Sequence, residues 1–304
     1  MATLAHLSDP HLAPLPRVRV SDLLNKRMLG YFNWHRKRKY VHIRGIAEAM
    51  VSDIAHQAPD HIAVTGDLVN ISLRDEFPAA RDWLATLGSA GDVSVVPGNH
   101  DAYVALPWQQ SMGLWDAHMT SDAAGAAHIG HNERFPFVRL CGRMALIGLS
   151  SAVPTPPLAA SGRLGGAQLN ALAAVLSSLR ADGSYRVVLI HHPPLPGQNS
   201  RRKALSDARE LQAVLETHGA ELVLHGHNHR DMAATLSTVD GTAHVIGVPS
   251  ASAVASGHRP AAQYNLYTLE TDAGTHRCQI TTRGYDEAES GFTTLRETTI
   301  SSGN

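Results

Sequence analysis

A histidine-rich segment, LVLHGHNHR from Leu222 to Arg230, is the first feature of the sequence that could carry chemistry. It places His225, His227 and His229 at every second position behind a short run of branched apolar residues. Alternate side chains of a β-strand point to the same face, so His227 and His229 can reach one spot at the strand's end. Imidazole is a common protein ligand for metals. The segment predicts a metal site, although a chain with 19 histidines can also carry such residues on a solvated surface.

Four further runs of strand-like residues end in similar side chains. They begin at Thr3, His61, Val93 and Arg186, and each is short and rich in branched apolar residues, as a buried strand is. Functional groups of α/β sheets gather beyond the carboxyl ends of the strands. The metal-competent residues after the five runs are Asp9, His11, Asp67, Asn99, His100, His191, His192, His227 and His229. Five such coincidences indicate one site assembled from five strand ends.

Helical patterns separate the strand-like runs. Apolar residues recur at helical spacing over 43–54, 169–179 and 211–215. Strands that alternate with helices predict an α/β core with parallel strand pairing.

Two later stretches are each split by a turn signal. The signals are Cys141-Gly142 and Asp240-Gly241, and they predict antiparallel hairpins. Together with the parallel core, they predict two sheets packed face to face with helices outside. The polar residues at the end of the chain predict a C-terminal tail over 286–304.

The order of the motifs, D-x-H, G-D, G-N-H-D, H-x-P and G-H-x-H, resembles that of the calcineurin-like metallophosphoesterase superfamily. The match spans residues 9–229 and leaves no ligand position unfilled. The resemblance implies an α/β fold, a four-layer αββα sandwich with two mixed β-sheets flanked by helices, in a single domain over 1–285. The length, GDLVN and HHPPLP are most similar to bacterial cyclic-nucleotide and glycerophosphodiester phosphodiesterases.

By this resemblance the chain holds two divalent metal ions. Asp67 occupies the position that the family uses as a bridge between them. The implied first site is completed by Asp9, His11 and His229, and the second by Asn99, His191 and His227. Nitrogen and oxygen ligands without thiolate favour Fe, Mn or Zn over Ca or Mg.

The resemblance also implies a reaction, in which a hydroxide that bridges the two metals attacks phosphorus. His100 and Asp67 are the expected catalytic residues, with His100 stabilising the transition state or protonating the departing oxygen. Phosphatases of the superfamily often place an aspartate three residues after the bridging one, where it orients this histidine. Here that residue is Asn70. An amide can hydrogen-bond the ring but cannot stabilise an imidazolium by charge, which leaves the proton-donor role of His100 open.

Several nearby residues have a second interpretation. His192 could replace His191 as a ligand, but the spacing of the H-x-P motif favours His191. His225 is expected to be a strand residue or a partner that orients a ligand, and Asp101 could cap a helix after GNH. The remaining histidines, His42 among them, have no informative spacing and are interpreted as ordinary surface or core residues.

A basic and aromatic insertion over 14–40 follows the first motif. Within it, 17–39 carries eight Lys or Arg residues against one acidic residue, interleaved with Tyr31, Phe32 and Trp34. Such a segment suits a lid whose aromatic rings cover an anionic, partly apolar substrate, or a peripheral contact with a membrane. A helix packed on the domain with a solvated basic face is the alternative.

Composition narrows the classes of function. The chain has 304 residues, 43% of them apolar, and can bury one large core. Its net charge of −1 argues against dedicated nucleic-acid binding. Two cysteines are too few for a disulfide framework, and the segment MATLAHLSDPHL does not resemble a secretory signal. We therefore expect a cytoplasmic protein without a membrane span.

The predicted function is hydrolysis of phosphodiester bonds in a small substrate, a cyclic nucleotide or a glycerophosphodiester. The insertion makes a lipid-linked (pyro)phosphodiester of the UDP-diacylglucosamine type the alternative substrate. A non-catalytic interaction scaffold on the same fold is the alternative from another class, but scaffolds of this superfamily have replaced ligand positions, and here none is replaced. The sequence leaves the oligomeric state open, a dimer included.

Overall fold

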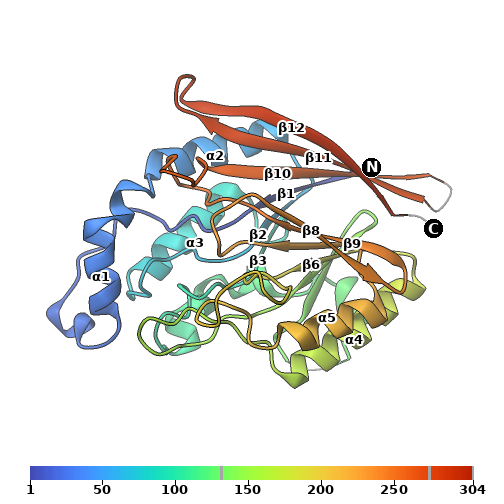
Figure 1. The fold of residues 1–304 in the computed structure, drawn as a ribbon, viewed down its shortest axis with the longest axis horizontal. Coiled ribbons are helices and arrows are strands. Elements are labelled where there is room, and N and C mark those ends of the chain that lie inside the picture. Colours follow the sequence, from blue (N-terminus) through green and yellow to red (C-terminus); the bar gives the residue numbers. More distant parts are fainter. Residues whose placement is uncertain (131–132, 273–274, 303–304) are drawn as a thin grey trace.

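The computed structural model describes residues 1–130, 133–272 and 275–302, which form two face-to-face β-sheets (Figure 1). The first sheet has the strand order β12-β11-β10-β1-β2-β3. Its strands are β1 (Ala2–Leu7), β2 (His61–Val64), β3 (Val93–Val95), β10 (Gln263–Asp272), β11 (Thr275–Asp286) and β12 (Gly291–Ser302). Pairing is parallel from β1 through β3 and antiparallel from β1 through β12.

The second sheet has the strand order β4-β5-β6-β7-β9-β8. Its strands are β4 (Phe137–Cys141), β5 (Met144–Gly148), β6 (Tyr185–Leu189), β7 (Leu222–His225), β8 (Met232–Thr238) and β9 (Gly241–Gly247). The strands β5, β6, β7 and β9 are parallel, with an antiparallel strand at each edge. The β4-β5 and β8-β9 pairs confirm the hairpins predicted at Cys141-Gly142 and Asp240-Gly241.

Helices cover the outer faces of both sheets (Figure 1). The α-helices are α1 (Arg27–Arg36), α2 (Arg44–Gln57), α3 (Glu76–Leu87), α4 (Gly166–Ala181) and α5 (Ala208–His218). The 3₁₀ helices are η1 (Val20–Leu23), η2 (Arg38–Tyr40), η3 (Trp108–Gln110), η4 (Met112–Met119) and η5 (Gly125–His128). The helices α2, α4 and α5 confirm the three helical patterns of the sequence.

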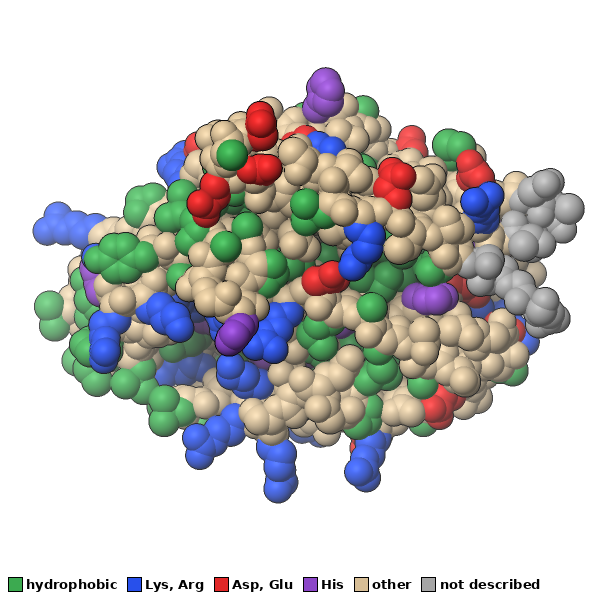
Figure 2. Space-filling view, turned by 45° about the horizontal axis from the view of Figure 1, so that its top comes forward, with side chains coloured by type: hydrophobic (Ala, Val, Ile, Leu, Met, Phe, Trp, Pro, Cys, Tyr) green, Lys and Arg blue, Asp and Glu red, His purple; other side chains and the backbone are tan. Residues whose placement is uncertain are grey.

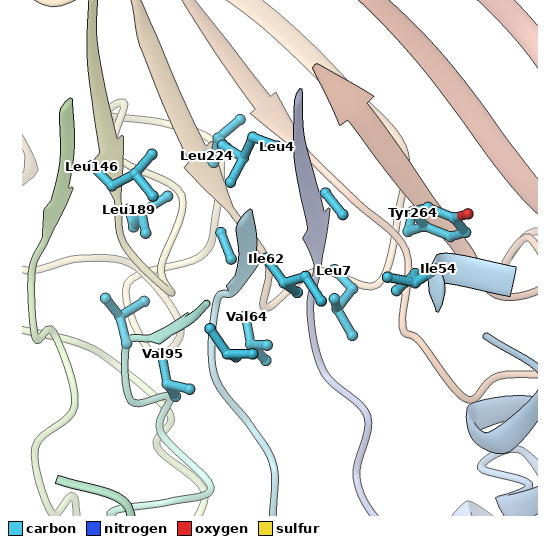
Figure 3. Packing of buried hydrophobic residues seen from close by; sticks show 14 of the residues in the cluster. Leu4, Leu7, Ile54, Ile62, Val64, Val95, Leu146, Leu189, Leu224 and Tyr264 are labelled. Carbon is cyan, nitrogen blue, oxygen red and sulfur yellow. The ribbon is translucent and has the colours of Figure 1, made fainter. Parts of the chain in front are cut away.

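Two apolar clusters hold the layers together. The larger joins α2 and α3 to the first sheet and continues between the sheets, where Leu4 lies near Leu224 (Figure 3). The smaller packs α4 and α5 on the outer face of the second sheet. Burying these side chains contributes about 25 cal/mol per Å² of apolar surface. The layers confirm the predicted four-layer sandwich.

The C-terminal residues correct the sequence prediction of a tail over 286–304. The segment Gly291–Ser302 forms the edge strand β12, antiparallel to β11, while 303–304 lie outside the described residues. Phe292 is buried and its ring packs against those of Tyr264 and Tyr285. The polar character of this segment comes largely from threonine, whose β-branched side chain favours strands. Within the ranges described above, no helix is both long and apolar enough to span a bilayer.

Candidate metal centre

Five strand ends meet at one point between the sheets. Asp9 and His11 follow β1, Asp67 follows β2, Asn99 and His100 follow β3, His191 follows β6, and His227 and His229 follow β7. All five strands are paired in parallel within their sheets, which places these residues beyond the strands' carboxyl ends. The predicted site residues are therefore brought together.

The backbone of this region is held in an uncommon conformation. Positive φ angles occur at Asp9 (54°), His11 (39°), Asp67 (57°), His227 (68°) and His229 (52°). Non-glycine residues seldom adopt this left-handed region, and each such residue costs on the order of 1–3 kcal/mol. Such strain persists where surrounding contacts impose it, and it concentrates at functional sites.

A first group of donor atoms is built from Asp9, His11, Asp67 and His229. His229 Nε2 lies 3.1 Å from Asp9 Oδ1 and 3.3 Å from His11 Nε2. His11 Nε2 lies 3.6 Å from Asp67 Oδ2 and 3.8 Å from Asp9 Oδ1. We call these four residues the first cluster.

A second group is built from Asp67, Asn99, His191 and His227, which we call the second cluster. His191 Nε2 lies 3.5 Å from Asp67 Oδ2 and 3.2 Å from Asn99 Oδ1. His227 Nδ1 lies 2.8 Å from Asn99 Oδ1 and 3.3 Å from His191 Nε2. The same oxygen, Asp67 Oδ2, therefore faces a histidine of each cluster.

Backbone carbonyls orient two of the histidines. His11 Nδ1 lies 3.1 Å from the carbonyl oxygen of Val69, and His191 Nδ1 lies 2.7 Å from that of Thr65. A carbonyl oxygen only accepts, so each Nδ1 carries a proton, and Nε2 is the ring nitrogen that faces the cluster. This is the arrangement by which proteins fix ligating histidines.

Charge in the centre is concentrated on buried carboxylates. Burial opposes the charge of Asp9, but His229 and then His191 hold its pKa below the ordinary range. Burial acts against protonation of His191, yet the Asp67 carboxylate raises the pKa of His191 to about 9. The two carboxylates thus attract positive charge strongly. Asp9 Oδ1 is also buried without a hydrogen-bond donor in good geometry among the described residues.

His100 lies beside the clusters but is held differently from the way the sequence suggests. Its ring Nδ1 donates to the backbone carbonyl of Asn70, whereas the Asn70 side chain donates to the carbonyl of Leu12. The hydrogen bond that the Asn70 amide could make to the ring is thus replaced by one to the backbone carbonyl of the same residue. Burial and the nearby charge of Arg38 lower the pKa of His100 to about 4, against the pull of Asp67.

The structure distinguishes His191 from His192 and His225, the neighbouring histidines that the sequence left open. Both ring nitrogens of His192 lie near other partners, Ser151 Oγ at 2.7 Å and the carbonyl of Ala160 at 3.2 Å, whereas Nε2 of His191 faces the second cluster. His225 is a buried residue of β7 whose Nδ1 lies 3.2 Å from the carbonyl of Gly226. Neither His192 nor His225 belongs to a cluster.

Asp101 does not cap a helix. Its carboxylate accepts from four backbone N–H groups, those of Asp67, Leu68, Val69 and Gly98, at 2.8–3.1 Å. These bonds hold the turn that contains Asp67 against the GNHD loop. The GNHD motif pointed to Asp101 in the sequence, but its role as an acceptor for the turn of Asp67 depends on a tertiary contact.

Two residues that the sequence analysis did not select also enter the site. The ring of His42 lies 4.6 Å from that of His11 and 5.5 Å from that of His229, measured between centroids, and its Nδ1 is 3.0 Å from Ser252 Oγ. His42 is therefore not an ordinary surface or core residue. Arg38 Nη1 lies 3.0 Å from His100 Nε2. Both come from the end of the insertion, for which the sequence offered no spacing argument.

The insertion packs over the rim of the site. Lys26 Nζ lies over the ring of Tyr103 and donates to Thr155, and the Tyr103 ring stacks against that of His100. Trp34 is only 4% exposed, so the prediction that it covers a substrate is wrong. Phe32 is 61% exposed, and Arg36 lies over its ring.

Two face-to-face sheets whose strand ends carry carboxylates and imidazoles are typical of the metallophosphoesterase class of folds. The chain is similar in structure to a dimetal phosphatase from Danio rerio, with a TM-score of 0.64, 16% identity and coverage of 99% of each chain. It is also similar to purple acid phosphatase PPD1 from yellow lupin, with a TM-score of 0.60, 13% identity and coverage of 99% of this chain and 53% of the other. At these identities the likeness shows the fold.

The sequence model of the family described as calcineurin-like phosphoesterase matches residues 2–231, and the chain belongs to this family. This confirms the resemblance drawn from the motifs and identifies the chain as a phosphoester hydrolase.

Two relatives are similar in sequence over most of the chain. A Synechococcus sp. (strain WH7803) protein named "Probable cyclic nucleotide phosphodiesterase" is 26% identical over 269 residues, 82% of each chain. The glycerophosphodiester phosphodiesterase GpdQ of Enterobacter lignolyticus is 26% identical over 253 residues, 80% of this chain and 78% of the relative.

Proposed function

We propose that the chain is a phosphodiesterase that uses two divalent metal ions, Fe, Mn or Zn. One observation carries the proposal: Asp67 Oδ2 lies 3.6 Å from His11 Nε2 and 3.5 Å from His191 Nε2, so one carboxylate oxygen serves both clusters. Asp9, His11 and His229 would complete the site of one ion, and Asn99, His191 and His227 would complete that of the other.

The donor atoms fit such ions. Ligand atoms about 2.1 Å from a tetrahedral ion lie about 3.4 Å from one another. The separations within the clusters run from 2.8 to 3.8 Å. Nε2 of His11, Nε2 of His191 and Asp9 Oδ1 all face inward, and a bound cation would satisfy each of them once Nε2 of His191 has released its proton.

When bound, two such ions supply Lewis-acid activation of water and of the phosphoryl group. The chain's own residues then hold the reactants. Asp67 Oδ1 accepts from the backbone N–H of His100 at 2.7 Å, which ties the shared carboxylate to the histidine. Nδ1 of His100 donates to the carbonyl of Asn70, so a neutral ring presents only a lone pair at Nε2, which lies 3.0 Å from Arg38 Nη1. As a neutral ring, His100 would therefore hold the Arg38 guanidinium, and it would stabilise the departing oxygen itself only when Nε2 carries a proton.

A small cytoplasmic diester is the substrate that we propose, a cyclic nucleotide or a glycerophosphodiester. The names of both similar proteins refer to diesters, and both cover about four fifths of this chain. Free, buried Cys141 and Cys278 agree with a reducing compartment.

A lipid-linked diester is the second candidate, and exposed apolar residues of the insertion favour it. Val20, Leu24, Met28 and Phe32 are 57–83% exposed. They lie at the end of the molecule formed by α1, where Figure 2 shows hydrophobic and basic side chains side by side. This combination suits peripheral contact with an anionic bilayer. Co-sedimentation with phosphatidylglycerol vesicles that Leu24→Ser weakens would support this candidate, and equal pelleting with and without vesicles would oppose it.

The test of the proposed function is a substrate panel with protein reconstituted in Mn, Fe or Zn. We expect faster cleavage of bis(p-nitrophenyl) phosphate than of p-nitrophenyl phosphate. Cyclic AMP, glycerophosphodiesters and UDP-linked lipids then distinguish the substrate candidates. A protein that cleaves none of them with any of the three metals would instead support the interaction scaffold.

A further inference from the structure

The insertion delivers one arginine into the site while its neighbours stay in solvent. Arg36, Lys37 and Lys39 are exposed, whereas the guanidinium of Arg38 reaches His100, with Nη1 3.0 Å from its Nε2. The surface of the insertion is therefore not uniformly basic. Of these four basic residues, only Arg38 reaches His100.

The backbone that carries Arg38 is anchored to the body of the protein. Directly after η2, the N–H of Ile43 donates to the carbonyl of Ser252 at 2.8 Å, and the N–H of Val254 donates to the carbonyl of Val41 at 2.9 Å. His42 adds its contact with Ser252 Oγ. Arg38 thus sits on a supported element, and its position does not depend on the exposed part of the insertion.

The guanidinium has an unused donor. Arg38 Nη2 is buried, and no hydrogen-bond acceptor for it exists among the described residues. A buried donor without an acceptor destabilises the fold, so such groups are retained where a ligand satisfies them. The charges of Asp67 and Asp9 act on Arg38 only through space. An oxygen atom that enters between Arg38 and the clusters would supply the missing acceptor.

We propose that Arg38 forms an anion subsite that binds a non-bridging oxygen of the substrate's phosphoryl group. This inference rests on the proposed function, since the phosphoryl group would lie on the metal side of His100. A guanidinium presents several N–H donors in one plane and suits the oxygens of a phosphoryl group. Arg38 can therefore contact the phosphoryl oxygen through Nη2 while Nη1 stays on His100.

The experiment compares Arg38→Met with the wild type, and Arg44→Met serves as the control. Arg44→Met removes the same charge nearby, but Arg44 is exposed and, among the residues that the structure describes, its one ion pair is with Glu48 on its own helix. Calorimetry measures the Kd of inorganic phosphate for metal-free and Mn-loaded protein, beside metal content and kcat/KM for bis(p-nitrophenyl) phosphate. Loss of a charged hydrogen bond predicts about a 10- to 100-fold weaker Kd and lower kcat/KM for Arg38→Met, with metal content and the control unchanged.

Unchanged phosphate affinity in Arg38→Met would overturn the inference, even if kcat fell, because a residue that only positions His100 would give that pattern. If Arg38→Met does not fold, Arg38→Lys is the second variant. It keeps the charge but lacks the planar fork, and wild-type phosphate affinity in it would equally overturn the proposal. Failure of the proposed function has a different outcome, since the wild type would then cleave no diester with any metal while phosphate binding still reports on Arg38.

Discussion

Replacing Asp67 by asparagine should weaken metal binding more at the second cluster than at the first, because Asp67 is the only carboxylate of the second cluster. The first cluster would keep the carboxylate of Asp9. Asparagine preserves the shape of the side chain and the acceptor for the N–H of His100, so the change is mainly one of charge.

The size of the effect follows from Coulomb's law. Two unit charges 4 Å apart interact by about 4 kcal/mol at an effective dielectric of about 20. A divalent ion doubles the attraction, and desolvation offsets part of it, so we expect a net loss of about 4 kcal/mol, or about 10³-fold in Kd for the second ion.

The assay is metal content after dialysis, with Mn affinity measured by calorimetry. We expect two ions per chain in the wild type and about one in Asp67→Asn, with a greater loss of activity than in His229→Gln. His229 belongs to one cluster only and is a neutral ligand. An Asp67→Asn protein that retains two ions at wild-type affinity would refute the shared-carboxylate reasoning. So would equal losses of activity in the two variants.

Three further predictions concern other parts of the structure. His100→Ala should retain both metals and lose about 10²–10³-fold in kcat, and an emptied metal site would instead make His100 a ligand. Burial, and next the charge of Arg139, lowers the pKa of His61 to about 4 in the folded chain, so His61 is neutral there at neutral pH. Its contribution to the free energy of unfolding, about 3 kcal/mol, is present above pH 6.5 and is lost as the pH falls toward 4. Urea unfolding of His61→Gln should depend less steeply on pH in this window, and equal slopes would contradict the reasoning. Trp34→Ala should cost about 3–5 kcal/mol in urea unfolding, whereas Phe32→Ala should change it by about 0.5 kcal/mol or less, and similar losses would show that Phe32 also packs.

Much of the centre could be predicted from the sequence because each donor directly follows a short buried strand. The carboxyl ends of parallel strands lie at the same edge of a sheet. The convergence of the five motifs can therefore be predicted without the conformations of the loops; the motifs are DPH, GD, GNHD, HHPP and GHNH. The two sheets and their hairpins follow from the same local patterns.

The remaining features depend on contacts that local patterns do not encode. Arg38 and His42 reach the site because the end of the insertion is fastened to 252–254, more than two hundred residues away. The bond between His100 and the carbonyl of Asn70 is independent of the side chain at that position. The strand β12 was missed because its threonines suggest a polar tail, although β11 supplies a partner.

Anomalous diffraction from crystals of Mn-loaded protein would show whether Asp67 lies between two metal ions, as we propose. We predict two anomalous peaks per chain, one on each side of Asp67 Oδ2, with one peak beside His11 and His229 and the other beside His191 and His227. A single peak, or two peaks that do not share Asp67, would show that Asp67 does not bridge two metal ions.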